Sequence, residues 1–335
     1  MESEGKNGFS RHLPYILGLV LLTFFFFIGY YDTKLPAHDI STSYYPGAEM
    51  LKISAAEYGD YWPLWNPYGF SGTPFLMKPL LGVDSLLGML VLVIPNTVIA
   101  LKMTYVLLFL LAGLSMYFLV VYLGFEKKYA LISALVYVLN GHMVKLLIWG
   151  WLTTLGGYAL LPLAFLFGVK AVKEKDWVLN SVLAGIVFAV LFRLNPDMKV
   201  AMWLGIMFGA YLLFNILIGF STKRIIKTLL VGGIIIGLFF GLSAVRMLPN
   251  MDYVSISSRG DVVWEQSSSR QLAYGSTFDR VIEPIYEGMP DVQRTGKGDH
   301  VGIIAFLLGG FAIYKKRKNK HVVFFGLLAL MSVLV

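Results

Sequence analysis

The sequence predicts an all-α membrane protein, a bundle of about nine membrane-spanning helices with two long loops on one side. Of its 335 residues, 57% are hydrophobic and only 14% are charged, and the mean hydropathy is +0.69. Soluble domains carry about 25% charged residues. A chain of this composition has too few polar side chains to cover a water-soluble body. Two further observations support the prediction: long apolar runs along the chain, and basic clusters between alternate runs.

The apolar runs have lengths typical of membrane helices, for which about 20 residues cross the hydrocarbon core. The first, Leu13–Tyr31, follows Lys6 and Arg11 and contains four consecutive phenylalanines. No small-residue cleavage signal follows it, so we expect a retained anchor rather than a signal peptide. The last run starts near His321, and we expect the chain to end within it. The runs between are Thr97–Leu123, Tyr129–Leu139, Gly156–Val169, Trp177–Phe192, Val200–Phe220, Ile226–Met247 and Val301–Tyr314.

Basic residues fall in five clusters, which hold 15 of the 28 basic but only 5 of the 20 acidic residues. Cytoplasmic loops of membrane proteins are enriched in Lys and Arg. The clusters therefore predict a cytoplasmic N-terminus and explain the net charge of +8 by topology rather than by nucleic-acid binding. They are Lys6/Arg11, Lys127/Lys128, Lys170/Lys173/Lys175, Lys223/Arg224/Lys227 and Lys315 through Lys320.

This topology makes residues 1–335 a single transmembrane domain with two outer loops, Asp32–Asn96 and Leu248–His300. The apolar stretch Leu80–Ile94 lies within the first outer loop. It is too short to span comfortably and would break the alternation of sides. We therefore expect an interfacial or re-entrant helix there.

The first outer loop is dense in proline, glycine and aromatic residues. Prolines fix φ and glycines permit close backbone approach, so the loop is more typical of a shaped surface than of a tether. Its Tyr and Trp rings suit stacking on sugars, and an aromatic belt at the membrane surface is the alternative. The candidate acceptor- or sugar-binding residues of this loop are His38, Tyr44, Tyr45, Trp65 and Asn66.

Asp39 lies one to two turns past the first apolar run, near the outer membrane surface. A carboxylate in that position is able to accept a proton from a hydroxyl group. An ordinary solvated loop aspartate is the alternative, and position alone leaves both open.

Other ionisable residues lie at the predicted outer ends of helices, where they tend to be functional. Arg246 precedes the end of the seventh run, and Arg193 and Asp197 flank Pro196. Arginine suits a lipid phosphate because its planar fork meets two oxygens at once. The alternative is a cation that extends to the headgroups, which we favour for Lys102 and Lys145.

Several segments resemble the YfhO-type membrane proteins of the GT-C class of glycosyltransferases. Asp39 follows the first helix and precedes a Tyr-Pro pair. The stretch from Leu64 to Phe75 is similar to the family's Trp-Asn-Pro…Gly-x-Pro segment, and Gly241–Pro249 resembles the end of its seventh helix. Lys78-Pro79-Leu80 is similar to a basic-Pro-Pro-Leu motif of some lipid-A and protein glycosyltransferases, with one proline missing.

The resemblance implies a GT-C-like fold and inverting transfer of a sugar from a polyprenyl-phosphate donor. Asp39 would be the catalytic base, and Arg246 with Arg193 or Lys78 would hold the donor phosphate. The acceptor would be an extracytoplasmic glycan, lipid or protein, and Asp197 would join its site. No protein-bound metal is predicted. Some members of the class use a divalent cation, which stays open as a cofactor.

Two other functions stay open from the sequence. A transporter or flippase of a lipid-linked saccharide predicts paired broken helices and a repeat in two halves, and the sequence has neither. A non-catalytic membrane scaffold is the second alternative. The chain contains no cysteine and no Gly-rich phosphate-binding motif, which excludes thiol chemistry and disfavours a nucleotide-sugar donor.

Overall fold

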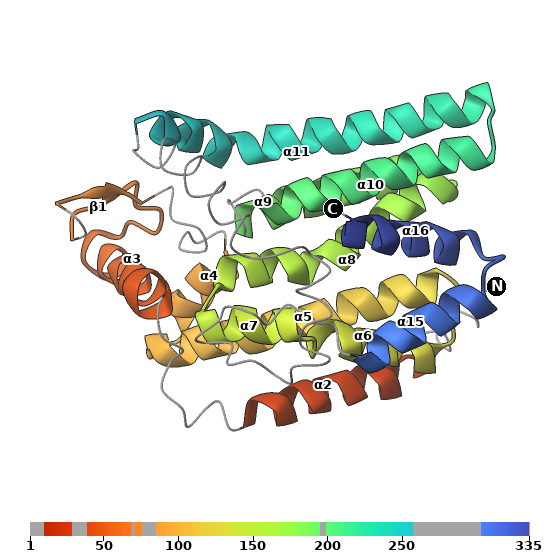
Figure 1. Cartoon of the computed structure of the whole chain (residues 1–335). Coiled ribbons are helices and arrows are strands. Elements are labelled where there is room, and N and C mark those ends of the chain that lie inside the picture. Colours follow the sequence, from red (N-terminus) through yellow and green to blue (C-terminus); the bar gives the residue numbers. More distant parts are fainter. Residues whose placement is uncertain are drawn as a thin grey trace.

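In the computed structural model the chain forms a bundle of roughly parallel helices, with smaller elements gathered at one end (Figure 1). The structure describes residues 10–28, 39–68, 71–75, 85–194, 199–256 and 303–334. The bundle helices are α2 Leu13–Phe27, α5 Thr97–Tyr122, α6 Lys127–Val138, α7 Gly141–Trp149, α8 Leu152–Lys173, α9 Trp177–Leu194, α10 Lys199–Ile218, α11 Thr222–Ile256, α15 Ile303–Lys315 and α16 Lys320–Leu334.

Within the described residues, five helical segments are long and apolar enough to cross a membrane: Thr97–Tyr122, Lys127–Trp149, Leu152–Lys173, Val200–Ile218 and Thr222–Asp252. Shorter apolar helices correspond to the first, fifth and last predicted runs. The prediction of an all-α membrane protein is therefore confirmed, whereas the count of about nine spans is not.

Two helices differ from the predicted runs. Helix α7 was not predicted: it begins just beyond the third run, where the side-chain oxygen of Asn140 accepts a hydrogen bond from Met143 N at 3.0 Å. The seventh run was expected to end at Met247, but α11 continues to Ile256 with Pro249 inside it. The first residues of the predicted second loop, 248–256, are therefore helical, and residues 257–302 lie outside the described part.

Helix α8 is the centre of the bundle. It packs against α5, α9, α10 and α11. In its most apolar stretch 72% of the residues are buried, against 22% for α11. Small residues allow this packing: the ring of Phe208 lies so close to Gly168 that a Cβ there would overlap with it. Helices without a large hydrophobic driving force between them associate through such close contacts.

In its described residues, the predicted first outer loop is folded rather than irregular. It contains the π-helix η2 Ile40–Tyr44, α3 Tyr45–Tyr58, the strands β1 Trp65–Asn66 and β2 Thr73–Pro74, and α4 Leu86–Val93. Helix α4 has eight residues, about 12 Å of rise, which is far too short to span a bilayer. It packs against α3 and α5.

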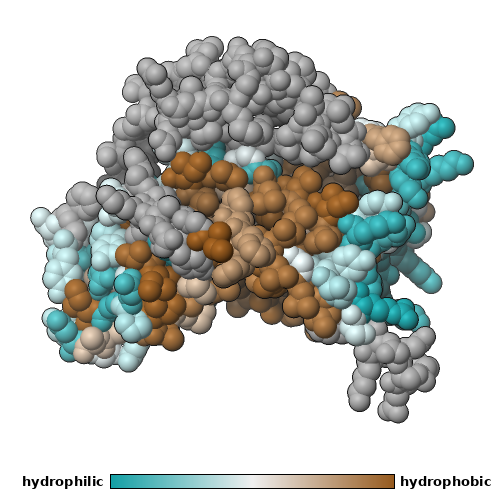
Figure 2. Space-filling view, turned by 90° about the horizontal axis from the view of Figure 1, so that it is seen from below, coloured by the Kyte–Doolittle hydropathy of each residue, from teal (hydrophilic) through white to brown (hydrophobic). Residues whose placement is uncertain are grey.

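The two ends of the bundle differ in chemistry. We call the end with η2, α3, the two strands and α4 the loop end. The opposite end carries the start of α6, the end of α8, the start of α11 and the turn between α15 and α16, and we call it the basic end (Figure 1). Figure 2 shows a hydrophobic band across the middle of one face, with hydrophilic side chains at both ends of it. The described residues of the basic clusters all lie at the basic end, as the charge pattern predicts.

Candidate functional site

Asp39 stands at the start of a firmly anchored segment. It is the N-cap residue of η2, and its half-buried side chain makes no capping hydrogen bond. The next residue, Ile40, is completely buried. Five residues after Asp39, the buried Tyr44 hydroxyl donates a hydrogen bond to Thr153 Oγ1 of α8 at 3.2 Å. The backbone that carries Asp39 is therefore held against the central helix, unlike that of a solvated loop.

The element itself is unusual. A π-helix is rare and occurs frequently at functional sites. Here it leads directly into α3, whose position is set by Lys52. The Lys52 ammonium donates hydrogen bonds to Pro95 O and to Thr97 Oγ1, the latter at 2.7 Å. The Lys52 hydrogen bonds thus hold α3 against the first turn of α5. In the same way, the Tyr44 hydrogen bond holds η2 against the first turn of α8.

The Trp-Asn-Pro segment forms a short antiparallel hairpin in which Trp65 pairs with Pro74 and Asn66 with Thr73. Asn66 is buried, and its Oδ1 accepts a hydrogen bond from Tyr68 N at 3.0 Å. The Trp65 indole lies on Gly72, where a Cβ would overlap the ring. Gly72 has φ +109°, which also favours glycine.

The hairpin gives two predicted binding residues, Asn66 and Trp65, different roles. Asn66 is engaged in shaping the turn and is 6% exposed, so it supports the hairpin rather than offering an open amide. Trp65 is 54% exposed, and one face of its indole packs on Gly72. The ring is therefore held in place with a surface available for stacking. Tyr44 is buried and bonded to Thr153, while the next residue, Tyr45, is exposed.

The two predicted phosphate-binding arginines lie on neighbouring helices at a similar height. Helices α9 and α11 run in the same direction, and Gly185 faces Leu238 so closely that a Cβ at Gly185 would lie 2.8 Å from the Leu238 Cβ. Arg193 is eight residues beyond Gly185, and Arg246 is eight residues beyond Leu238. At 1.5 Å per residue, both arginines stand about 12 Å farther toward the loop end.

Their burial differs. Arg246 is only 6% exposed, whereas Arg193 is half-buried. A long cationic side chain that extends to the headgroups keeps its charged tip in water. Arg246 does not fit that description because the whole residue is enclosed in the protein.

Sequence reasoning misjudged Lys102. We expected its ammonium to reach the headgroups, but the residue is 4% exposed. It lies on α5 one turn from the completely buried Tyr105, on the same helix face. The available signal was a single lysine six residues into an apolar helix, where an ionisable group is costly and tends to be functional. His142 also packs inward, with its ring centroid 4.6 Å from that of Tyr158.

Three predicted site residues, His38, Lys78 and Asp197, lie outside the described residues, and so does any site that needs them. Within the described part of the chain, no three His, Asp or Glu side chains gather in a group that could hold a metal ion. Asp39, the hairpin and the two arginines all belong to the loop end.

Comparison with known proteins gives a family match. Residues 85–335, about three quarters of the chain, match the model of a family described as the 6-pyruvoyl-tetrahydropterin synthase related domain, a membrane protein. The match begins at Ser85, so Asp39 and the Trp65 hairpin precede it. Neither the curated proteins nor the solved structures gave a match.

Proposed function

We propose that this chain, which belongs to the 6-pyruvoyl-tetrahydropterin synthase related family of membrane proteins, is a membrane glycosyltransferase. Its donor would be a polyprenyl-phosphate-linked sugar. The site would be at the loop end, on the extracytoplasmic side. The acceptor would be a hydroxyl group of a cell-envelope glycan, lipid or protein.

The proposed reaction needs one base and one anion-binding group. The Asp39 carboxylate takes the proton of the acceptor hydroxyl as its oxygen forms a bond to the anomeric carbon from the face opposite the leaving group. The bond from that carbon to the donor phosphate breaks, and the phosphate leaves with the electron pair. The product is inverted at the anomeric carbon. Because the phosphate is already a stable anion, no acid is needed to protonate it.

The observation that carries the proposal is the setting of Asp39. A general base must be held in a defined geometry, because a misplaced group loses most of its effect. Asp39 is half-buried, stands next to the fully buried Ile40 and precedes a segment bonded to α8 through Tyr44 and Thr153. An ordinary loop aspartate has no comparable support from the core.

The donor phosphate would bind Arg246, with Arg193 beside it on α9. A cation in a water-poor setting stabilises a developing phosphate charge more strongly than one in bulk water. Arg246, at 6% exposure, meets that condition. The exposed Trp65 ring on its Gly72 support is the proposed stacking surface for a sugar.

The test is Asp39→Asn in purified protein reconstituted in nanodiscs. The probes are polyprenyl-phosphate mannose, glucose and galactose, each supplied with an extract of cell-envelope glycolipids. Transfer is measured by mass spectrometry as released polyprenyl phosphate and glycosylated acceptor. Asn keeps the size of Asp but cannot take a proton, so we expect a loss of about 10²–10⁴ in rate with donor binding retained.

Asp60→Asn is the matched control. Asp60 is exposed, and its Oδ1 accepts a hydrogen bond from Trp62 N at 2.9 Å, which an asparagine oxygen preserves. It should transfer sugar at the wild-type rate. A wild-type transfer rate in Asp39→Asn would show that Asp39 is not the catalytic base. Movement of the donor across the membrane without release of polyprenyl phosphate would favour a transporter.

A further inference from the structure

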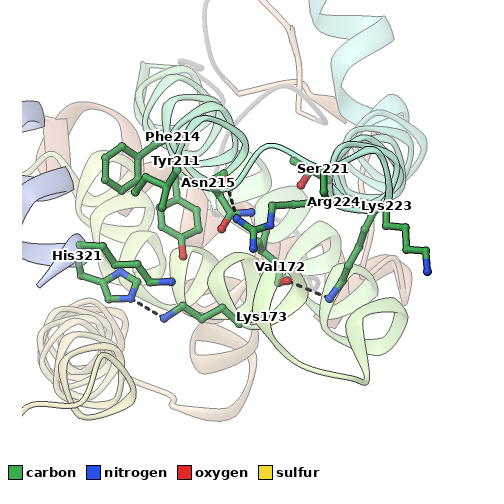
Figure 3. Close-up of a pocket in the computed structure, with 13 residues that line it drawn as sticks. Val172, Lys173, Tyr211, Phe214, Asn215, Ser221, Lys223, Arg224 and His321 are labelled. Carbon is green, nitrogen blue, oxygen red and sulfur yellow. Dashed lines mark hydrogen bonds between the residues drawn. The ribbon is translucent and has the colours of Figure 1, made fainter.

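A cavity of about 430 Å³ lies at the basic end, far from the site proposed above. It is partly open to the surface and is lined by the end of α8, the end of α10 and the first turns of α11 and α16 (Figure 3). Its cationic and imidazole lining residues are Lys173, Lys223, Arg224, Lys227, Lys320 and His321. None of the described residues that line it is an Asp or Glu.

Two of the lysines, Lys173 and Lys227, are held in place by neutral groups. Lys227 Nζ donates hydrogen bonds to Val172 O at 2.9 Å and Glu174 O at 3.0 Å, across the C-terminal carbonyls of α8. Lys173 Nζ lies 2.6 Å from His321 Nε2. Among the residues that the structure describes, neither lysine forms an ion pair.

Arg224 is held by its surroundings in a similar way. Its guanidinium lies over Gly219, where a Cβ would overlap with Nη1, and Nη1 points toward Asn215 O at 3.5 Å. Its backbone N–H bonds to Ser221 Oγ at 3.3 Å at the start of α11. Figure 3 shows the guanidinium between the labelled Asn215 and Val172, whereas Lys223 extends away from the group.

The nearest acidic residue in sequence does not neutralise this group. The Glu174 Oε2 atom accepts a hydrogen bond from Asn180 Nδ2 at 3.2 Å, outside the cavity lining. Several like charges that share a low-dielectric wall repel one another and attract a counter-ion. The first turns of α11 and α16 add the positive ends of two helix dipoles.

The other walls are apolar. Val172, Tyr211, Phe214 and Ile218 line the cavity beside the cations. Ile218 is 54% exposed, and Leu217 next to it is 68% exposed, so this part of α10 continues into the lipid-facing surface. A ligand that fits both surfaces has an anionic head and an aliphatic portion.

We infer that the cavity at the basic end binds the phosphate group of an anionic lipid, with Arg224, Lys173 and Lys227 around the phosphate and the acyl chains along α10. Arginine offers a bidentate fork to phosphate oxygens, while the two lysines act as fixed point charges. This site is independent of the proposed sugar transfer, because it shares no residue with the loop end.

The test is native mass spectrometry of the purified protein, released from nanodiscs of phosphatidylcholine that contain phosphatidylglycerol. Wild-type protein should retain phosphatidylglycerol in preference to phosphatidylcholine. Arg224→Gln should lower that retention about tenfold or more, since a hydrogen bond to a charged group is lost. Gly219→Ala should lower it too, because the added methyl group displaces the guanidinium while every charge remains.

Lys318→Gln is the matched control. It removes one charge from the same end, but Lys318 is exposed and does not line the cavity. Equal losses in Lys318→Gln and Arg224→Gln, or full retention in both Arg224→Gln and Gly219→Ala, would overturn the inference.

A competition experiment with 10 mM inorganic phosphate distinguishes a lipid phosphate from free phosphate as the ligand. Retention that phosphate leaves unchanged supports a lipid ligand, whereas displacement by free phosphate overturns the lipid assignment. Thermal unfolding of each variant verifies that it is folded.

Discussion

The loop end and the basic end use ionisable residues in opposite ways. At the loop end, Arg246 and Lys102 are each almost fully buried, and Asp39 is half-buried beside packed side chains. At the basic end, cations are numerous and most are exposed, and their positions follow from the topology of the chain. A sparse buried charge must have a specific partner or task, because it is costly to enclose. A charge in an exposed cluster needs none. Arg224 is itself exposed, and its guanidinium is positioned by its contacts with Gly219 and Asn215.

The most decisive way to break this comparison is to determine which end faces the cytoplasm. The chain has no cysteine, so single-cysteine variants report one position each. We expect Asp60→Cys to react with a membrane-impermeant maleimide in intact cells, and Lys318→Cys to react only after permeabilisation. Both residues are exposed. The reverse pattern would put the loop end in the cytoplasm and remove the case for an extracytoplasmic donor.

The next largest effect is expected at Arg246. If the buried guanidinium holds the donor phosphate, Arg246→Ala should lower kcat/KM for the polyprenyl-phosphate sugar by about 10- to 100-fold. Arg246→Lys should recover only part, because a point charge does not replace a bidentate fork. Lys318→Ala at the basic end is the control and should leave the kinetics unchanged. Equal donor kinetics in Arg246→Ala and wild type would mean that burial at the loop end reflects packing alone.

A smaller effect tests how the two arginines are kept at a similar height. Gly185→Ala would bring a methyl group to 2.8 Å from the Leu238 Cβ and 3.4 Å from the Ile235 Cα. We expect a loss of about 1–3 kcal/mol in unfolding free energy, measured by thermal or denaturant unfolding in detergent. Gly237→Ala on α11 is the control. Its Cβ has no neighbour within 4 Å, so the helix propensity of alanine should make it neutral or slightly stabilising. Equal stability in both variants would argue against close packing of α9 on α11.

The smallest effect concerns the anchor of the Asp39 segment. Tyr44→Phe removes the hydrogen bond to Thr153 Oγ1 and should cost about 1 kcal/mol of stability, with a further loss of any activity that depends on the position of Asp39. Tyr45→Phe changes the same group on the neighbouring, exposed residue and should be nearly silent in an unfolding experiment. Greater destabilisation by Tyr45→Phe would contradict the packing described for η2.

Sequence patterns predicted the parts of the fold that depend on hydropathy and charge averaged over many residues. Apolar runs and basic clusters sum over many residues, so they identified most bundle helices and the gathering of basic residues at one end of the bundle. They could not show that Asn140 caps a further helix, α7, just after the third run, because a cap depends on a single polar residue rather than on an average. The continuation of α11 beyond Met247 was missed for the related reason that this last part of the helix contains Pro249 and polar residues.

The candidate site was predicted less completely. Asp39, Trp65 and Arg246 were identified from residue type and resemblance, but their burial depends on contacts distant in sequence, such as that between Tyr44 and Thr153. Lys102 was misjudged because its surroundings come from other helices. The cavity around Arg224 was not predicted, since it arises where the starts of two helices meet the ends of two others.

The height of Arg246 has a consequence for how a lipid-linked ligand would reach it. The apolar part of α11, Ile226–Met247, rises about 33 Å, close to the roughly 30 Å of a hydrocarbon core, and Arg246 is its penultimate residue. Met251 and Asp252 beyond it are exposed. A lipid phosphate in the adjacent leaflet lies at nearly this level, so a donor would approach by two-dimensional diffusion without leaving the membrane. The quantity that saturates such a site is the mole fraction of donor among the lipids, rather than its concentration in water.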